Sequence, residues 1–478
     1  MQPKNNIFSL KEAQIKMASI LRGCRLEERI QRFEIPVYPV DILLWLSLQK
    51  NDVKIYGSDK NNAMVMAGIG ETLCIKGQRL GSYKKVLTTL RLFLSSRYPY
   101  LQWYGGFCFD DRYLDKQWSD FGAYRFIIPR FELAARGGKM IFCCNLAEGD
   151  KISSVLKELR KLVVDDVILR QYISGNYVSK GPIASTSSDC VIARRVFHRR
   201  SNLLKDCFAS LAMTRDERIT ARSDKPQREK WEQRVNKILS DASIKKAVLA
   251  RRTTLVFKKA PDPWMLLRNL KEVTPNSYHY AFQFKGNIFL GASPERLYFR
   301  QERLVDSEAL AGTSPISSGV MALKASDKNK REHAIVVDAL KASFKKCCVS
   351  FKYDKRPHIL SLSNGHHFIT HFKGQLKRTV GDEDLLKSLH PTPALGGLPR
   401  QRALWLIHDL EGFSRGWYGG PMGYVAQNKT EFVVGIRSGL LEGTKLHLFA
   451  GAGIVQGSKA SDEWDEVENK ISNFIKII

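Results

Sequence analysis

The 478-residue chain lacks any apolar run approaching the roughly 20 residues that span a membrane. The apolar run Val40–Leu46 is short and contains Asp41. The residues Met1–Asn6 do not show the basic-then-apolar pattern of a secretory signal. From these absences we expect a cytoplasmic protein without a membrane-bound part.

Cysteine is scarce and irregularly placed. The nine cysteines, which include the doublets Cys143-Cys144 and Cys347-Cys348, form neither a zinc-ligand pattern nor a disulfide framework. We therefore expect reduced cysteines that pack in the core. The sequence also contains no internal repeat and no low-complexity segment.

Acidic residues are few compared with basic ones. The chain has 48 Asp and Glu against 76 Lys and Arg, a net charge of +28, which raises the hypothesis of a non-catalytic basic protein that binds nucleic acid or anionic lipid. The basic residues are spread along the chain and concentrate only mildly at Arg194–Arg200 and Arg215–Lys237, without a nucleic-acid-binding motif. An anionic small substrate or a generally basic proteome would explain the charge equally well.

The chain is longer than the usual single-core domain and contains 44% apolar residues. Apolar periodicity predicts helices at 41–49, 84–95, 153–164, 328–344, 382–389, 400–410 and 461–478. It predicts strands at 63–74, 124–133, 246–257, 278–284, 288–292, 366–376, 431–440 and 445–450. This composition is typical of a sheet-rich α+β fold. The polar, Arg-rich stretch 191–234, with a break at Ser223–Pro226, predicts a division into halves 1–225 and 226–478.

The last predicted helix places three charges on one face. Glu463, Glu466 and Lys470 fall within about 60° of one another, close to the apolar stripe rather than on the solvated side. Two carboxylates one turn apart suit a hard cation, and the lysine suits an anion bound beside it. An ordinary Glu466–Lys470 surface pair is the alternative.

Other charged residues stand where an apolar element would bury them. Glu332 lies near the centre of an apolar helical stripe, so it either binds a cation shared with Glu466 or is stabilised by the helix N-terminus. Lys246 begins an apolar strand, where a partly desolvated amine can act as a general base, although such lysines are usually solvated. Glu295 follows Pro294 in a turn that can fix a carboxyl group at a cleft or leave it on the surface.

Two further segments can contact an anion. The stretch Ala450–Gly453 is expected to follow a strand and to expose successive backbone N–H groups, although tight turns use the same residues. Arg437 is a charge inside the apolar strand predicted at 431–440, and its planar guanidinium suits either a substrate carboxylate or a structural ion pair.

Taken together, these segments resemble the chorismate-utilising enzymes, the family of isochorismate, salicylate, anthranilate and aminodeoxychorismate synthases. The likeness covers about residues 226–478 in the family's order. It rests on KAVLAR (246–251), GASPERL (291–297), LAGT (310–313), REH (331–333), HPTPALGG (390–397), RGWYGG (415–420), IRS (436–438), AGAGIV (450–455) and EWDEVENK (463–470). The first half agrees more loosely, through DILLWL (41–46), WYGGF (103–107) and FIIPRF (126–131).

The resemblance implies a fold in which two antiparallel β-sheets pack together with helices on the outside. Lys246 stands where water-using members carry a base lysine, whereas ammonia-using members typically have glutamine. Ala311 stands where aminodeoxychorismate synthases often have a nucleophilic lysine. The implied reaction is therefore attack of water on C2 of chorismate, with Lys246 as base and protonated Glu295 assisting departure of the C4 hydroxyl.

The resemblance also implies a cofactor and a set of substrate contacts. Mg²⁺ would be bound by Glu332 and Glu466, with Glu463 adjacent or bridging through water. The anionic substrate would be held by Arg437, Tyr418, Lys470, Gly451, Ala452, Gly453, Thr313, His367 and Thr370. The partner is the small molecule chorismate; a monomer is favoured, although the sequence does not reveal the oligomeric state.

Isochorismate and salicylate synthases share the hydration step, and salicylate synthases then eliminate pyruvate in the same pocket. The ending Glu466–Lys470 and the first-half segments look most like menaquinone-pathway isochorismate synthases, which favours isochorismate as the product. The sequence departs from the family at Ala247, Arg331 and Phe368, and none of these changes removes a proposed catalytic group. Arg331 would weaken metal binding if it reached the Glu332 carboxylate.

Overall fold

The computed structural model describes residues 7–170 and 219–478 and contains two large antiparallel sheets. The first sheet has 12 strands. In spatial order they are β1 (Ile30–Val37), β8 (Lys139–Ala147), β7 (Phe131–Arg136), β3 (Met64–Ile69), β2 (Val53–Ser58), β11 (Tyr278–Phe284), β12 (Asn287–Ser293), β21 (Ser438–Glu442), β22 (Lys445–Val455), β10 (Lys246–Phe257) and β18 (Gly397–Leu398), with β9 (Ile219–Lys225) also pairing with β10.

The second sheet has 10 strands. Their order is β15 (Cys348–Tyr353), β17 (Gly365–Leu376), β14 (Leu304–Ser314), β13 (Arg296–Gln301), β20 (Lys429–Val434), β19 (Pro421–Val425), β5 (Trp103–Phe107), β6 (Tyr124–Ile128) and β4 (Leu73–Gly77), with β16 (His358–Leu362) also pairing with β17. Both sheets combine strands from the two halves of the chain, because β2 pairs with β11 and β5 pairs with β19. The division at residue 225, at the end of β9, stays a prediction.

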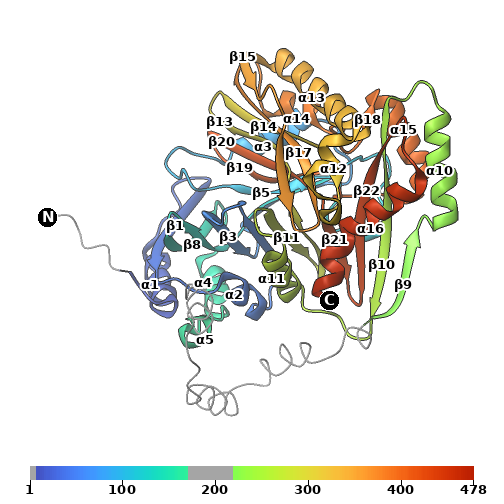
Figure 1. The fold of residues 1–478 in the computed structure, drawn as a ribbon. Helices are drawn as coiled ribbons and strands as arrows, with labels where there is room; N and C mark the ends of the chain where they lie inside the picture. Colours follow the sequence, from blue (N-terminus) through green and yellow to red (C-terminus); the bar gives the residue numbers. More distant parts are fainter. Residues whose placement is uncertain (1–6, 171–218) are drawn as a thin grey trace, which may run out of the picture.

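Helices cover the outer faces of the two sheets (Figure 1). They are α1 (Leu10–Gly23), α2 (Ile42–Leu48), α3 (Tyr83–Arg91), α4 (Ile152–Arg160), α5 (Asp166–Arg170), α10 (Arg228–Ser240), α11 (Pro263–Val273), α12 (Gly319–Ala325), α13 (Asp327–Cys347), α14 (Asp382–Leu389), α15 (Arg400–Glu411) and α16 (Ala460–Ile477), with short 3₁₀ turns at Lys116–Trp118 and Ile316–Ser318. The expected α+β class with two packed antiparallel sheets is confirmed. None of the described helices is both long and apolar enough to cross a membrane.

An aromatic cluster contributes to the core. Trp118, Phe121, Phe289 and Trp417 meet mostly edge to face, with ring centroids 5.3–6.5 Å apart. Gly416, which precedes Trp417, has φ +54°, and a Cβ atom there would lie 2.0 Å from the Trp118 ring. This glycine therefore allows the RGWYGG segment to approach the ring.

Three predicted strands are wrong in one respect: each passes from one sheet to the other. Residues 63–74 divide into β3 and the start of β4, and residues 124–133 divide into β6 and β7. The third, 431–440, divides into β20 and β21, so Arg437 lies in the crossover at φ +52° and not inside a strand. Strand β22 continues to Val455, so Ala450–Gly453 lie within a strand and not in a turn after it.

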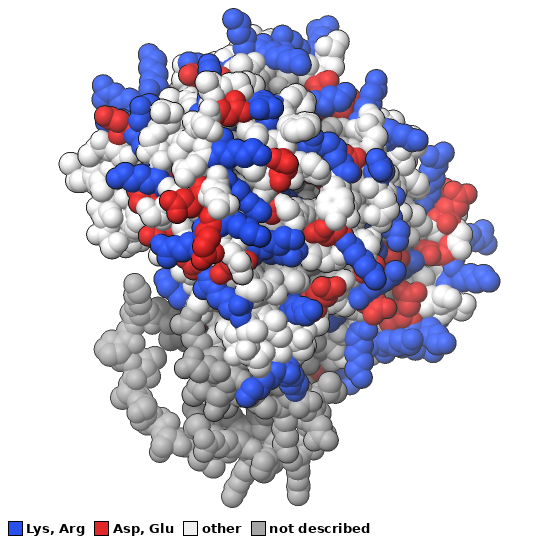
Figure 2. All heavy atoms as spheres, turned by 90° about the vertical axis from the view of Figure 1, so that its right-hand side faces the viewer, with Lys and Arg blue, Asp and Glu red and all other residues white. Residues whose placement is uncertain are grey.

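The basic charge is dispersed rather than gathered on the face shown in Figure 2, where Asp and Glu side chains lie among the Lys and Arg. Exposed ion pairs join separate elements: Lys237 with Asp409, Arg402 with Asp241, and Arg222 with Glu468. The Arg-rich segment 194–200 lies outside the described residues. Of the nine cysteines, Cys108, Cys143, Cys144, Cys347 and Cys348 are free and buried, as expected, and Cys24 and Cys74 are free and partly exposed.

Candidate active site

Strand β10, strand β22 and helices α13 and α16 converge on a small cavity of about 80 Å³. β10 and β22 pair so that Val248 lies opposite Gly453, and α16 packs along β22 (Figure 1). The cavity is lined by Val248, Pro294, Glu295, Leu310, Ala311, Gly312, Thr313, Glu332, His367, Ala394, Leu395, Tyr418, Ile436, Arg437, Phe449, Ala450, Gly451, Gly453, Glu466 and Lys470. The structure thus brings together residues from most of the sequence motifs.

Lys246 and Glu332 form a buried pair beside this cavity. Lys246 is the first residue of β10, its side chain is fully buried, and Nζ donates a hydrogen bond to Glu332 Oε1 at 2.8 Å. Burial tends to raise the pKa of Glu332, but the charge and hydrogen bond of Lys246, with the charges of Lys328 and Lys470, outweigh it and lower this pKa. Lys246 does not line the cavity itself and is connected to it through Glu332.

Gly453 makes the approach of Lys246 and Glu332 possible. A Cβ atom at this position would lie 2.3 Å from Glu332 Oε1 and 2.9 Å from Lys246 Cε. Both distances are shorter than van der Waals contact, so no other residue fits without moving the pair. This requirement is a different role from the anion contact expected from the sequence.

We therefore predict that Gly453→Ala displaces the Lys246–Glu332 pair. Overpacking of this kind lowers the free energy of unfolding by about 1–3 kcal/mol, and a displacement near 1 Å in an active site lowers turnover about 10²-fold. Chemical denaturation and steady-state assays of the same preparation measure the two effects. Gly23→Ala is the control, because a Cβ atom there meets nothing within 4 Å. Equal turnover in the two variants would contradict the requirement.

The three carboxylates predicted as metal ligands lie on α13 and α16, and each has a lysine partner. Lys246 pairs with Glu332, Lys328 with Glu463, and Lys470 with Glu466, whose Nζ–Oε1 distance is 2.6 Å. Lys470 Nζ also donates to the Gly451 carbonyl at 2.8 Å. The Glu466–Lys470 pair expected as the simpler alternative is thus present, but both residues line the cavity.

The donor types of this set suit a hard divalent cation. Its ligands are carboxylate oxygens from two helices, which is the chemistry that Mg²⁺ and Ca²⁺ prefer. Glu463 Oε2 is buried without a hydrogen-bond partner, and burial together with the charge of Glu466 raises the pKa of Glu463. A cation would relieve both costs. The oxygens of Glu332, Glu463 and Glu466 do not all lie within 4.8 Å of one another, and Glu463 does not line the cavity.

Glu295 sits in the short link between β12 and β13, where its side chain enters the cavity instead of pointing to solvent. The residue is 3% exposed. Burial, assisted by the charge of Glu308 and opposed by Lys246, raises its pKa to about 8. At neutral pH this carboxyl group is therefore mostly protonated and can donate a proton.

Arg437 and Tyr418 also line the cavity and supply polar groups to it. The Arg437 guanidinium makes no hydrogen bond or ion pair to a described residue. Burial lowers its pKa to about 10, with Glu466 opposing, so Arg437 remains charged at neutral pH. The Tyr418 ring stacks on Phe449 at 5.5 Å, and burial raises the pKa of Tyr418 to about 12. Both groups can hold an anion.

The remaining predicted contacts divide into two groups. Thr313 and His367 line the cavity, and the Thr313 hydroxyl lies 3.1 Å from His367 Nδ1. Burial, with Arg437 and Lys470 nearby, lowers the pKa of His367 well below its usual value and keeps the ring neutral. Thr370 and Ala452 do not line the cavity, and the Thr370 hydroxyl instead bonds His333 Nε2 at 2.8 Å.

The sequence analysis missed residues that support the cavity wall. Arg415 donates to the carbonyls of Leu395 and Val248, at 2.8 and 2.7 Å, and its Nε donates to Glu411 at 2.8 Å. The motif containing Arg415 was recognised, but its spacing does not reveal these long-range partners. Lys328, the partner of Glu463, was also missed, because nothing in the sequence distinguishes it from Lys330 in the first turn of α13.

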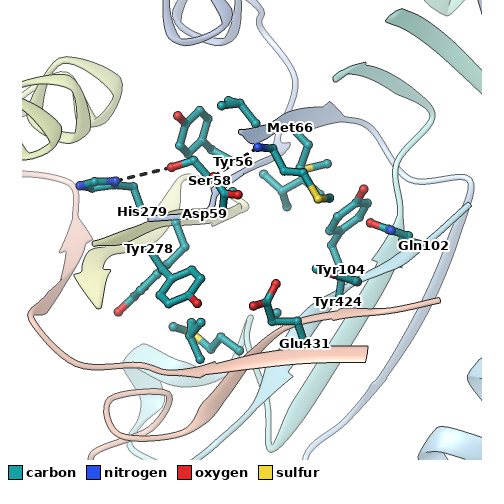
Figure 3. A pocket seen from close by; sticks show the side chains of 18 of the residues that line it. Tyr56, Ser58, Asp59, Met66, Gln102, Tyr104, Tyr278, His279, Tyr424 and Glu431 are labelled. Atoms are coloured by element: carbon teal, nitrogen blue, oxygen red, sulfur yellow. Dashed lines mark hydrogen bonds between the residues drawn. The ribbon is translucent and has the colours of Figure 1, made fainter. Parts of the chain in front are cut away.

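A larger cavity, with a volume of about 260 Å³, lies elsewhere in the described part of the chain. Figure 3 shows that it is lined by aromatic side chains, among them Tyr104, Tyr278 and Tyr424, and that Ser58 lies near His279 on one wall. None of the acid, base or metal-ligand candidates lines it. Size therefore does not identify the active site, and the chemistry of the lining residues does.

Comparison with known proteins identifies the family of the chain. The family model for chorismate binding enzymes matches residues 19–173 and 162–478. The chain belongs to this family. Isochorismate synthase 2 of Arabidopsis thaliana is 30% identical over 439 residues, which cover 88% of this chain and 71% of the relative. Isochorismate synthase MenF of Bacillus subtilis is 35% identical over 276 residues, covering 55% of this chain and 58% of the relative.

The fold of this chorismate-binding enzyme is also known from solved structures. The structure of MenF, the menaquinone-specific isochorismate synthase from Escherichia coli, matches with a TM-score of 0.75 and 24% identity. The match covers 98% of this chain and 99% of that chain. This likeness supports the arrangement of the two sheets, including the strands contributed by the first half.

Proposed function

We propose that this chorismate-binding enzyme is an Mg²⁺-dependent isochorismate synthase that isomerises chorismate. The observation that carries the proposal is a cavity lined by Glu295, whose pKa is raised to about 8, and by Glu332, which is hydrogen-bonded to the buried Lys246 behind it. The relatives from Arabidopsis thaliana and Bacillus subtilis named above support isochorismate as the product. The base position also favours water over ammonia, because it holds lysine and not glutamine.

In the proposed reaction, Lys246 as a neutral amine takes a proton from the water that attacks C2. The ring double bonds shift, and Glu295 gives its proton to the departing C4 hydroxyl, which leaves as water. One hydroxyl is gained and one is lost, so the product has the mass of the substrate. Proton exchange with solvent restores Lys246 and Glu295.

The binding groups differ in charge and would therefore have different roles. When bound, Mg²⁺ would neutralise the Glu332 and Glu466 carboxylates and hold a carboxylate of the substrate. Arg437, Lys470 and Tyr418 would hold the anionic groups, and neutral His367 would offer a hydrogen bond without adding charge.

A product assay tests this function directly. The purified chain is incubated with chorismate, with and without Mg²⁺ and ammonium, and the products are resolved by chromatography with mass detection. We expect an Mg²⁺-dependent isomer of unchanged mass that does not require ammonium. Salicylate with pyruvate would indicate a salicylate synthase, an ammonium-dependent product would contradict water as nucleophile, and unchanged chorismate would contradict the proposal as a whole.

The variant Glu466→Gln tests whether Glu466 is a metal ligand. We expect the Mg²⁺ concentration for half-maximal activity to rise at least about tenfold, since loss of a group that only supports a metal ligand already costs this much. Mg²⁺ titrations of turnover measure the change. Glu468→Gln is the control on the same helix, because Glu468 pairs with Arg222 and Arg251 rather than lining the cavity. The same Mg²⁺ response in both variants would show that Glu466 is not a ligand.

We further propose that the product enters menaquinone synthesis. The likeness of the Glu466–Lys470 ending and the first-half segments to menaquinone-pathway isochorismate synthases supports this role. Expression of the chain in a bacterium that lacks its own isochorismate synthase should restore menaquinone, measured by quinone extraction. If the chain is expressed and catalytically active but does not restore menaquinone, the pathway assignment is contradicted, whereas the result of the product assay still stands.

A further inference from the structure

Three potential metal ligands gather at the edge of the second sheet, and the proposed reaction uses none of them. Strands β15 and β16 both pair with β17 and are separated by a short link that begins at Asp354. Tyr353 lies opposite Phe372, which places Asp354 opposite His371. His358 lies opposite Ile369, two positions from His371, so all three side chains share one face of the sheet.

The ligand atoms are already close together. The Asp354 Oδ2 atom lies 2.8 Å from His371 Nδ1 and 3.4 Å from His358 Nε2, and the three ligand atoms all lie within 4.8 Å of one another. Ligand atoms around a tetrahedral ion, bound at about 2.0–2.2 Å, lie roughly 3.3 Å apart. Small side-chain adjustments would therefore bring all three onto one ion.

The backbone fixes the carboxylate in this position. The His371 N–H donates to Asp354 Oδ2 at 2.9 Å, and the Asp354 N–H donates to the His371 carbonyl at 3.2 Å. A regular strand pairing thus holds Asp354 and His371 together and keeps the Asp354 carboxylate beside both imidazoles.

The ligand types and the surrounding charge select the class of metal. Two imidazoles and one carboxylate suit Zn²⁺ and similar ions, whereas Mg²⁺ and Ca²⁺ prefer oxygen ligands. Lys352 and Lys373, which pair across β15 and β17 on the same face, are exposed, as are Lys355 and Arg356 in the link. The surrounding positive charge disfavours cations that bind mainly by electrostatic attraction. Coordination by the histidine nitrogens is then the main source of binding.

We propose that Asp354, His358 and His371 form a surface binding site for a zinc-class divalent cation, separate from the catalytic cavity. The ion would tie the link between β15 and β16 to β17 and leave a coordination position open to solvent. It would therefore stabilise the edge of the second sheet, where the exposed strand pairs with no further strand of the described residues.

Zinc titration of the full chain tests this site. Calorimetry is performed with excess Mg²⁺ to occupy the carboxylates of α13 and α16, and thermal unfolding is followed with and without Zn²⁺. We expect the unaltered chain to bind one Zn²⁺ with a Kd on the order of micromolar, and bound Zn²⁺ to raise Tm. The double variant His358→Asn and His371→Asn should lose this Zn²⁺ and the rise in Tm.

His366→Asn is the matched control, since His366 lies on β17 and contacts Ser361 rather than the cluster. It should bind zinc as the unaltered chain does. Equal zinc stoichiometry and affinity in the double variant, or no zinc binding tighter than about 1 mM in the unaltered chain, would overturn the site.

Electron paramagnetic resonance of Cu²⁺ bound to the unaltered chain gives a check that needs no variant. Hyperfine coupling to two nitrogens supports the site, and a spectrum without nitrogen coupling overturns it.

Discussion

Replacing Lys246 with glutamine should lower the kcat of chorismate isomerisation by about 10²–10⁴-fold, the range that a positioned general base contributes. Glutamine keeps much of the side-chain volume and a hydrogen-bond donor, but it cannot accept the proton of the attacking water. Because the Lys246 side chain is fully buried, bulk water cannot easily take over this role. Chorismate consumption and isomer formation under saturating Mg²⁺ measure the loss.

The neighbouring lysine provides the control for this substitution. Lys245 is exposed, and Lys245→Gln removes the same charge from the chain without touching the cavity. It should leave kcat within about twofold of the unaltered enzyme, as expected for a surface change. Retention of kcat in Lys246→Gln would show that another group activates the water, even if the product assay identifies isochorismate.

Sequence periodicity predicted best those elements that do not cross from one sheet to the other. Strand β10 and helix α14 begin and end at the predicted residues, because polar or turn residues flank each apolar stretch. The predicted strand 63–74 failed because its apolar residues are buried in both sheets, so hydropathy does not change where the chain crosses. Gly70, with φ +67°, marks this crossover and was the signal available in the sequence.

The family motifs located most of the cavity, but they did not specify its contacts. Glu332 and Glu466 were expected to share a cation. The Glu466–Lys470 pair considered as the alternative is present, and the structure adds the pairing of Glu332 with Lys246 from β10. Thr370 was expected in the cavity, yet β17 directs it to His333. Such differences arise because a motif gives order along the chain, whereas distances depend on how distant elements pack.

Helix α16 illustrates how the fold fixes these distances. Its cavity face carries Glu466 and Lys470, and its flanks are anchored on both sides. The Arg251 guanidinium lies 3.9 Å from the Trp464 ring centroid and donates to Glu468 at 2.5 Å. On the other flank, Asn469 and Asn364 exchange side-chain to backbone hydrogen bonds at 2.5 and 3.1 Å. These anchors hold the helix between β10 and the turn that precedes β17.

Replacing Glu295 with glutamine should lower kcat by about 10²–10⁴-fold and also change the pH dependence. Burial raises the pKa of Glu295 to about 8, so the unaltered enzyme holds the required proton below this pH and loses it above. We therefore expect activity of the unaltered enzyme to fall as pH rises through about 8. Glutamine has no proton to transfer at any pH, so the residual activity of the variant should lack this fall.

The Glu295 prediction separates an acid from a structural group that merely fills the cavity. Glu302→Gln makes the same chemical change at an exposed turn after β13 and should retain both turnover and the fall near pH 8. A purely structural Glu295 would leave the pH profile of Glu295→Gln parallel to that of the unaltered enzyme. Loss of turnover together with loss of the alkaline limb is expected only if the Glu295 proton is used in the reaction, because the amide preserves the shape of the side chain and removes only its ionisation.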